Sequence, residues 1–244
     1  MHMDTRIIEL KKTILEDNDK DAALLREESR QEKCSYLNVM SSPGSGKTTT
    51  ILALLEILGK HISCGVMEAD IDSDVDARAV QEKGYPCVQL HTGGMCHLDA
   101  QMSRQGMRAL REEWAIRNAQ AMCDETGQTK CGPELIILEN VGNLVCPAEF
   151  DTGADCNVVI LSVPEGDDKP LKYPLMFEKA DVVLINKMDA LPAFDFDMEK
   201  CKAGIRLRNE KAPVFPVSAR TGEGIPEAAE YILTHVQKRT GAGD

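Results

Sequence analysis

The chain has 244 residues, of which 43% are hydrophobic, so it carries enough apolar material for one α/β domain with a sizeable core. Its formal net charge of −12 argues against nucleic acid as the main partner, because binding to phosphates needs a basic surface. No apolar run approaches the roughly 18 residues that span a bilayer, and the charged N-terminus lacks the apolar centre of an export signal. We therefore expect a cytoplasmic protein that contacts neither nucleic acid nor membrane.

The nine cysteines are an odd number in a chain without an export signal, so we do not expect a disulfide framework. Four of them lie in or beside apolar, strand-like runs and are interpreted as small buried hydrophobic residues: Cys34, Cys64, Cys87 and Cys156.

Hydrophobic periodicity predicts an amphipathic, charged helix over residues 5–32, followed by strands that alternate with helices. Strands are expected at Tyr36–Met40, Ile62–Glu68, Cys87–His91, Leu135–Glu139, Asn157–Val163, Val182–Asn186 and Val214–Val217. Helices are expected at Lys47–Leu58, Val75–Lys83, Leu98–Cys123 and from Pro226 to about Lys238. This order is typical of the α/β class, with a mostly parallel central sheet and helices on both faces. We expect an N-terminal helical extension, residues 1–33, and a single domain, residues 34–244.

A phosphate-binding loop is predicted where the first strand meets the first helix, in Ser41–Thr48 (SSPGSGKT). Small residues let the backbone N–H groups turn inward around a phosphate, at a helix N-terminus. Lys47 is expected to neutralise the β- and γ-phosphates, and the Thr48 hydroxyl to bind Mg²⁺. Ser41 replaces the usual first glycine. A turn that only joins strand to helix is the alternative. The predicted nucleotide contacts in this segment are Gly44, Ser45, Gly46, Lys47, Thr48 and Thr49.

Acidic residues that can help to hold Mg²⁺ stand at the ends of two strands. Glu139 ends a very apolar run, in the position of a Walker B acid, and Asp70 follows the second strand, with Asp72 as a further candidate. Strand C-termini in such sheets lie on the ligand edge. A helix N-cap or a solvated loop carboxylate is the alternative role for each acid. We assign Mg²⁺ to Thr48, Asp70 and Glu139, and catalysis to Lys47, Thr48 and Glu139.

Guanine recognition is predicted from Asn186–Asp189 (NKMD), which ends another apolar strand. The Asp189 carboxylate can accept hydrogen bonds from guanine N1–H and the 2-amino group, whereas adenine would leave it unpaired. Asn186 would address the N7/O6 edge, and the stem of Lys187 would lie along the ring. Ser218 and Ala219, after the last strand, are expected to present a backbone N–H to guanine O6.

A transition-metal site is predicted from Cys96 and His97, which follow the third strand, and from Cys146, which lies just beyond the Walker B strand. Thiolate and imidazole ligands suit Ni²⁺ or Zn²⁺. Spacing alone leaves the alternative open that the Cys-His pair is structural.

Several of these segments resemble the HypB family, GTPases that help to load nickel into [NiFe]-hydrogenase. The two signature segments are Cys96–Ala100 (CHLDA) and Glu139–Pro147 (ENVGNLVCP), and the similarity extends through Glu68–Ala77, Ser162–Pro174 and Asn186–Asp189. It covers roughly residues 36–240. The urease maturation GTPase UreG is less similar, because its metal motif is Cys-Pro-His.

The resemblance implies a P-loop GTPase of the SIMIBI class that dimerises with nucleotide and shares a metal site between subunits. Carried over to this chain, the metal ligands are Cys96, His97 and Cys146. The implied cofactors are GTP or GDP, Mg²⁺, and Ni²⁺ or Zn²⁺. The implied partners are a second copy of the chain, a HypA-type nickel chaperone or SlyD-type protein, and the hydrogenase large subunit.

Two departures from the family bear on the metal site. No cysteine precedes Cys34, and His2 is the one histidine in that region, so the N-terminal Cys-x-x-Cys-Gly-Cys motif and the His-rich nickel store of some members are absent. The spacing from Cys96 to Cys146 is also longer than in the family. The polar segment around residues 115–132 accounts for the excess and carries Cys123 and Cys131, which leaves an altered ligand set open.

The sequence therefore predicts a slow GTPase that acts as a nickel metallochaperone in hydrogenase maturation. The alternatives are urease maturation in the manner of UreG, or a metal-binding scaffold in which nucleotide only sets the conformation. Asp72 and Asp74 are weak candidates for positioning the attacking water, and no arginine finger is identified. Lys169 is a candidate for a nucleotide contact across the dimer, or else a solvated loop lysine.

Overall fold

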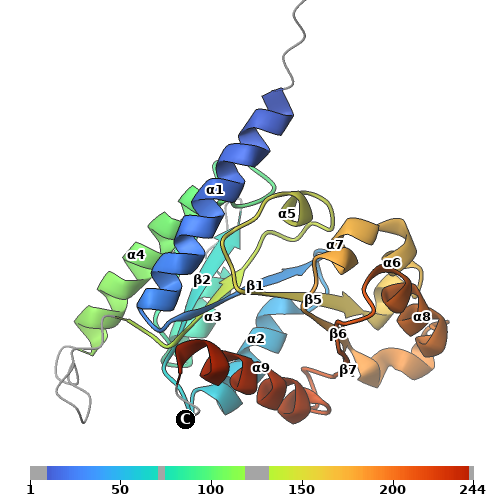
Figure 1. Cartoon of the computed structure of the whole chain (residues 1–244). Helices are drawn as coiled ribbons and strands as arrows, with labels where there is room; N and C mark the ends of the chain where they lie inside the picture. The colour runs from blue at the N-terminus through green and yellow to red at the C-terminus, as the bar shows by residue number, and fades with distance from the viewer. Residues whose placement is uncertain (1–9, 71–74, 119–131, 242–244) are drawn as a thin grey trace, which may run out of the picture.

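The computed structural model describes residues 10–70, 75–118 and 132–241, and their centre is a parallel sheet (Figure 1). The strand order is β3-β2-β4-β1-β5-β6-β7, and every neighbouring pair is parallel. The strands are β1 Ser35–Ser41, β2 Cys64–Asp70, β3 Cys87–His91, β4 Leu135–Glu139, β5 Cys156–Ser162, β6 Val182–Asn186 and β7 Val214–Pro216. The predicted α/β class is confirmed.

Helices connect these strands, as parallel pairing requires. The longer ones are α1 Leu10–Gln31, α2 Lys47–Leu58, α3 Val75–Glu82, α4 Ala100–Arg117, α8 Met198–Arg208 and α9 Ile225–Thr240. The short ones are α5 Cys146–Glu149, α6 Lys169–Lys172 and α7 Pro174–Glu178, with 3₁₀ turns η1 Val163–Glu165 and η2 Met188–Ala193. Four of these helices were not predicted from the sequence: α5, α6, α7 and α8.

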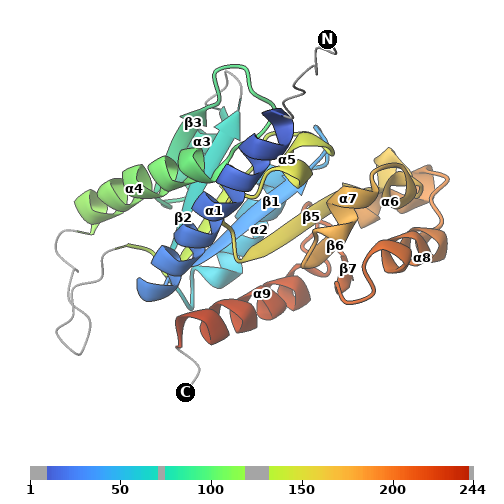
Figure 2. The same cartoon turned by 45° about the horizontal axis from the view of Figure 1, so that its top comes forward.

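The helices form two layers, one on each face of the sheet. On one face α2, α3 and α9 bury side chains such as Leu55, Val80 and Ile232 against the strands. On the other face α1 and α4 cover β2 and β4, while α7 and α8 cover β5 and β6. Figures 1 and 2 both show α1 running beside α4, with α5 on its other side. Both layers leave the carboxyl ends of the strands open for the motifs that follow them.

Several boundaries differ from the predicted ones. The second strand is Cys64–Asp70 and not Ile62–Glu68, because its pairing with β4 begins at Cys64↔Leu135 and places Glu68 opposite Glu139. Helix α4 begins at Ala100 and not at Leu98, because the Asp99 side chain caps it by accepting from the Met102 N–H at 2.8 Å. The predicted end of this helix at Cys123 lies outside the described residues.

The four cysteines that were interpreted as hydrophobic are all buried, with exposed fractions of 5% or less: Cys34, Cys64, Cys87 and Cys156. Burial raises the pKa of the Cys87 thiol to about 12, so it remains protonated and unreactive near neutral pH. None of the helices that the structure describes is both long and apolar enough to span a bilayer.

Candidate nucleotide and metal site

The predicted phosphate loop joins β1 to α2 and has the backbone that its glycines allow. Gly44 and Gly46 have φ angles of 75° and 92°, in the left-handed region that a side chain disfavours. A Cβ on Gly46 would also lie 2.8 Å from Nδ2 of Asn186. The loop therefore depends on glycine at Gly46 for both its conformation and its close approach to the predicted base motif.

The predicted base motif is tied directly to this loop. Asn186 donates from Nδ2 to the Ser45 carbonyl at 2.9 Å and accepts from the Ala219 N–H at 3.1 Å. Lys187 adopts a left-handed φ of 63°, and its Nζ donates to the Gly44 carbonyl at 2.6 Å. Three segments that are far apart in the sequence thus meet at one place, at the carboxyl ends of β1, β6 and β7.

Asp189 is held in place from the segment after β7. The Ser218 hydroxyl donates to its Oδ1 at 2.7 Å, and Arg220 Nη1 lies 3.7 Å from its Oδ2. A carboxylate with two acceptor oxygens can keep a hydrogen bond of this kind and still accept from a base. The structure therefore brings together Asp189 and Ser218, two residues that were each predicted to lie at the base site.

Serine replaces the first glycine of the phosphate loop without being left unpaired. The buried Ser41 hydroxyl donates to the Ser42 carbonyl at 2.8 Å and accepts from the Ser45 hydroxyl at 2.6 Å. The Ser42 hydroxyl donates to Glu165 in η1, whose other carboxylate oxygen accepts from Ser162. Glu165 was not predicted as a site residue, since its contact with the loop spans more than a hundred residues of sequence.

Thr48 and Glu139 meet at the start of α2. The Thr48 hydroxyl donates to Glu139 Oε1 at 2.8 Å, while Glu139 Oε2 is buried without a hydrogen-bond partner. Burial raises the pKa of Glu139 to about 7, although Lys47 and the Thr48 hydroxyl act in the opposite direction. The unpartnered Glu139 Oε2 and the nearby Thr48 hydroxyl are a suitable pair of ligands for Mg²⁺, which prefers oxygen ligands.

Asp70 belongs to a second cluster of carboxylates, which come from the neighbouring strand β2 and from helix α3. Ligand atoms of Glu68, Asp70 and Asp76 lie within 4.8 Å of one another. Glu68 is 2% exposed and stands opposite Glu139, so burial and the Glu139 charge raise its pKa to about 8. Glu68 and Asp76 were not predicted here, although a carboxylate inside the apolar run of β2 was a visible signal. Asp72 and Asp74 lie outside the described residues.

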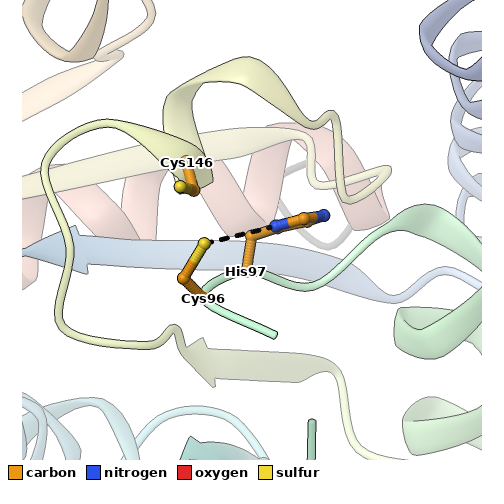
Figure 3. A group of neighbouring side chains, drawn as sticks. All are labelled: Cys96, His97 and Cys146. Atoms are coloured by element: carbon orange, nitrogen blue, oxygen red, sulfur yellow. Dashed lines mark hydrogen bonds between the residues drawn. The ribbon is translucent and has the colours of Figure 1, made fainter. Parts of the chain in front are cut away.

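The predicted metal ligands converge in one place (Figure 3). Cys96 and His97 lie in the segment between β3 and α4, and Cys146 is the first residue of α5. Their ligand atoms all lie within 4.8 Å of one another, and Cys96 Sγ is 3.9 Å from His97 Nδ1. All three side chains are half-buried. Cys123 and Cys131 lie outside the described residues, so the structure does not test whether either joins this site.

Local contacts fix the segment that carries Cys146. The Asn143 side chain accepts from the N–H groups of Val145 at 2.7 Å and Cys146 at 3.4 Å, which starts α5. The His97 ring stacks on Phe150, with ring centroids 3.7 Å apart and planes 14° apart.

Two pKa shifts bear on the chemistry of this group. Burial lowers the pKa of His97, which keeps the imidazole neutral and able to bind a cation near pH 7. A hydrogen bond with Cys96, followed by burial, raises the pKa of Cys146 in the metal-free protein. A soft divalent cation would displace the thiol protons on binding, since the thiolate is the ligand.

Loop residues 140–145 connect the two parts of the site. They run from Glu139 at the phosphate loop to Cys146 at the metal group. Gly142 in this loop packs on the phosphate loop, because a Cβ built on it would lie 3.1 Å from Pro43 Cα and 3.2 Å from Pro43 N. A displacement of the phosphate loop would therefore displace the loop of residues 140–145, and the reverse also holds.

The nucleotide contacts predicted for two further residues stay predictions. Thr49 is exposed on the first turn of α2. Lys169 begins α6 and places its Nζ 5.7 Å from the centroid of the Tyr173 ring, so its proposed contact across a dimer stays a prediction.

The family model for the CobW/HypB/UreG nucleotide-binding domain matches residues 35–216. The hydrogenase maturation factor HypB of Azotobacter chroococcum is 43% identical over 93% of this chain and 69% of its own length. The hydrogenase/urease maturation factor HypB of Helicobacter pylori is 37% identical over 94% of this chain and 87% of its own length.

A solved structure gives the same result. The crystal structure of HypB from Helicobacter pylori in complex with nickel superposes with a TM-score of 0.81 at 36% identity, over 92% of this chain and 97% of that chain. Sequence and fold thus agree over most of the molecule, and the chain belongs to the HypB branch of the CobW/HypB/UreG family of nucleotide-binding proteins.

Proposed function

We propose that the chain is a GTP-hydrolysing metallochaperone that binds nickel, or zinc, and assists nickel insertion into the [NiFe]-hydrogenase large subunit. The observation that carries this proposal is the convergence of Cys96, His97 and Cys146 at the end of a loop that begins at the phosphate site. A metal group on its own would suit storage. Its attachment to a nucleotide site favours a switch, in which both ligands bias one conformational equilibrium.

In this proposal the protein recognises both the phosphates and the base of the nucleotide. Lys47 and the inward backbone N–H groups of residues 44–48 neutralise the phosphates, which is the main contribution in phosphoryl transfer. Mg²⁺, when held by Thr48, Glu139 and the neighbouring Asp70, would supply further charge neutralisation at the phosphates. Asn186 and Asp189 select guanine over adenine by hydrogen bonding to its edge.

The nickel ion is the cargo of this protein. Two thiolates and one imidazole leave a soft ion short of the four ligands that Zn²⁺ or Ni²⁺ commonly takes. A second copy of the chain can complete the shell, which would make dimerisation depend on the metal. The partially exposed side chains around the group, with Met95 45% and Val145 49% exposed, suit an interface. A HypA-type chaperone is the proposed source of the ion.

A phosphate-release assay tests the GTPase half of the proposal. Lys47→Ala should abolish phosphate release while the circular dichroism spectrum stays that of the parent, because Lys47 contributes charge and no core packing. Lys60→Ala, an exposed lysine just beyond the same helix, is the matched control and should release phosphate at the parent rate. Unchanged turnover in Lys47→Ala would remove this residue from the site. GTP binding without any phosphate release in the parent would favour the scaffold alternative.

Urease maturation is kept as a second candidate because one HypB relative, that of Helicobacter pylori, is named a hydrogenase/urease maturation factor. Complementation separates the two. Expression of this chain in a strain that lacks its own HypB should restore hydrogenase activity, whereas restoration of urease activity in a strain that lacks UreG would favour the alternative.

A further inference from the structure

The two segments that carry the metal group are joined by a residue of α1. Asn18 is 8% exposed, and its side-chain oxygen accepts from the Ala100 N–H at 2.9 Å. Its side-chain nitrogen donates to the Asp151 carbonyl at 2.9 Å. Ala100 follows His97 by three residues, and Asp151 follows Cys146 by five. One amide therefore spans the gap between the two metal-bearing segments.

This bridge lies next to a second one. The His97 ring stacks on Phe150, the residue directly before Asp151. The stacked rings and the Asn18 amide thus join the same two segments at neighbouring positions, which fixes their separation and the plane of the imidazole. The amide also satisfies the N–H of the first residue of α4, a group that a helix leaves without an internal partner.

Further contacts from α1 fasten the Cys146 segment. The Arg26 guanidinium pairs with the Asp151 carboxylate and donates from Nε to the Ala154 carbonyl at 2.8 Å. Beside them, a cavity of about 340 Å³ is lined by residues of α1 and by Pro147–Thr152. Where side chains do not pack closely, individual hydrogen bonds have more influence on the position of a segment.

We propose that Asn18 is a positioning residue for the metal site, which sets the distance between the Cys96–His97 segment and the Cys146 segment. The inference rests on the proposed metal ligands. Groups that hydrogen-bond to metal ligands commonly influence affinity by about 10–100-fold. We expect an effect of the same order from Asn18, because it holds the backbone of both ligand-bearing segments. Helix α1 thereby contributes to metal binding although the sequence assigns it no ligand.

Nickel titration of three variants tests the bridge, with Ni²⁺ as the probe and the sulfur-to-nickel absorption bands as the signature. Asn18→Ala should weaken Ni²⁺ binding by about 10–100-fold and shift those bands. Asn18→Asp keeps the acceptor at the N-terminus of α4, where a negative charge is favourable, but cannot donate to the Asp151 carbonyl, so it should also weaken nickel binding. Gln101→Ala removes another α1–α4 hydrogen bond, from Gln101 Nε2 to Asp21 at 2.8 Å, and should bind nickel as the parent does.

The outcomes separate the bridge from the metal site itself. GDP affinity and the metal-free melting curve are measured in every variant, because a general loss of structure would lower both. If Cys96→Ala loses nickel while both Asn18 variants bind it as tightly as the parent, the bridge is wrong and the proposed site stands. If only Asn18→Asp binds nickel as tightly as the parent, Asn18 acts on the N-terminus of α4 alone, and the proposed bridge to Asp151 is wrong. If Cys96→Ala keeps its nickel, the proposed metal site fails and the bridge with it.

Discussion

Asp189 is the side chain on which the proposed preference for guanine depends. Its carboxylate is oriented by the Ser218 hydroxyl at 2.7 Å, so little freedom has to be lost when a base binds. Two hydrogen bonds from guanine to a charged acceptor contribute about 1.5–3 kcal/mol each.

Asp189→Asn should therefore weaken GTP binding by about 10²–10⁴-fold and improve the binding of xanthosine triphosphate, whose 2-oxo group accepts from the new amide. Isothermal titration with both nucleotides measures the change. Glu223→Gln, at an exposed carboxylate beyond the Ser218 segment, is the control and should bind GTP as the parent does. Parent-like GTP affinity in Asp189→Asn would contradict the assignment of the base site.

Glu68 and Glu139 are two buried carboxyl groups that stand opposite each other on β2 and β4. The pKa of Glu68 lies at about 8, far above its ordinary 4.5, first because of burial and then because of the Glu139 charge. The folded state holds this proton more tightly than the unfolded chain. The contribution to stability is therefore complete below about pH 4.5 and is lost as the pH rises through about 8.

Without divalent cations, the free energy of unfolding of the parent should fall between about pH 4.5 and pH 8, and Glu68→Gln should reduce that fall because its amide does not ionise. Urea unfolding at several pH values in a chelating buffer measures it. Glu56→Gln, at an exposed carboxylate of α2, should keep the slope of the parent. An identical slope in Glu68→Gln would show that Glu68 is ionised at neutral pH in the folded protein.

At the scale of elements, the loop of residues 140–145 is the connection between nucleotide and metal. It leaves β4 at the Mg²⁺ candidate Glu139 and enters α5 at Cys146. Its contact with the phosphate loop is made at Gly142, where a side chain has little room beside Pro43.

Gly142→Ala should press on the phosphate loop, since overpacking of this kind costs about 1–3 kcal/mol. We expect nucleotide affinity to fall at least about fivefold, as measured by titration with GDP. Gly204→Ala is the matched control, because its Cβ would meet Pro170 Cβ at 3.3 Å, far from the phosphate loop. Equal GDP affinities in both variants would mean that the loop moves independently of Pro43.

The elements also show what could be predicted from the sequence. The phosphate loop, the guanine motif and the Cys-His pair are short contiguous segments whose chemistry is visible without the fold. The structure brings the guanine motif to the phosphate loop, and the Cys-His pair to Cys146. Helix α8 was missed because few of its 11 residues are buried, namely Cys201, Gly204 and Ile205, so its apolar pattern is weak. Its cap at Asp197, which accepts from the Lys200 N–H at 3.0 Å, was the available signal.

Contacts between segments that are distant in the sequence could not be predicted from the motifs. The pairing of Glu68 with Glu139 follows from the register of β2 on β4, which no local pattern specifies. Glu165 at Ser42 and Asn18 at Asp151 likewise depend on how helices and turns pack around the sheet. Such residues orient the predicted ones, and they become visible only in three dimensions.

At the scale of the whole molecule, the parallel sheet places both candidate sites at one edge. Its three motifs for nucleotide and its metal group follow different strands, yet all strands end on the same side. A dimer that forms around this edge would bury the metal and face the nucleotides toward each other. The proposed function therefore requires that the affinities for the two ligands depend on each other, by the same factor in both directions.

Nickel titration with GDP and with a non-hydrolysable GTP analogue, followed by light scattering, tests this requirement most directly. The parent should bind nickel with affinities that differ by about 5–150-fold between the two nucleotides and should form dimers when metal is present. Cys96→Ala should lose nickel and metal-promoted dimers but keep nucleotide binding, whereas His61→Ala, at an exposed histidine away from the group, should behave as the parent. Equal nickel affinity in both nucleotide states, or parent-like nickel binding in Cys96→Ala, would contradict the account.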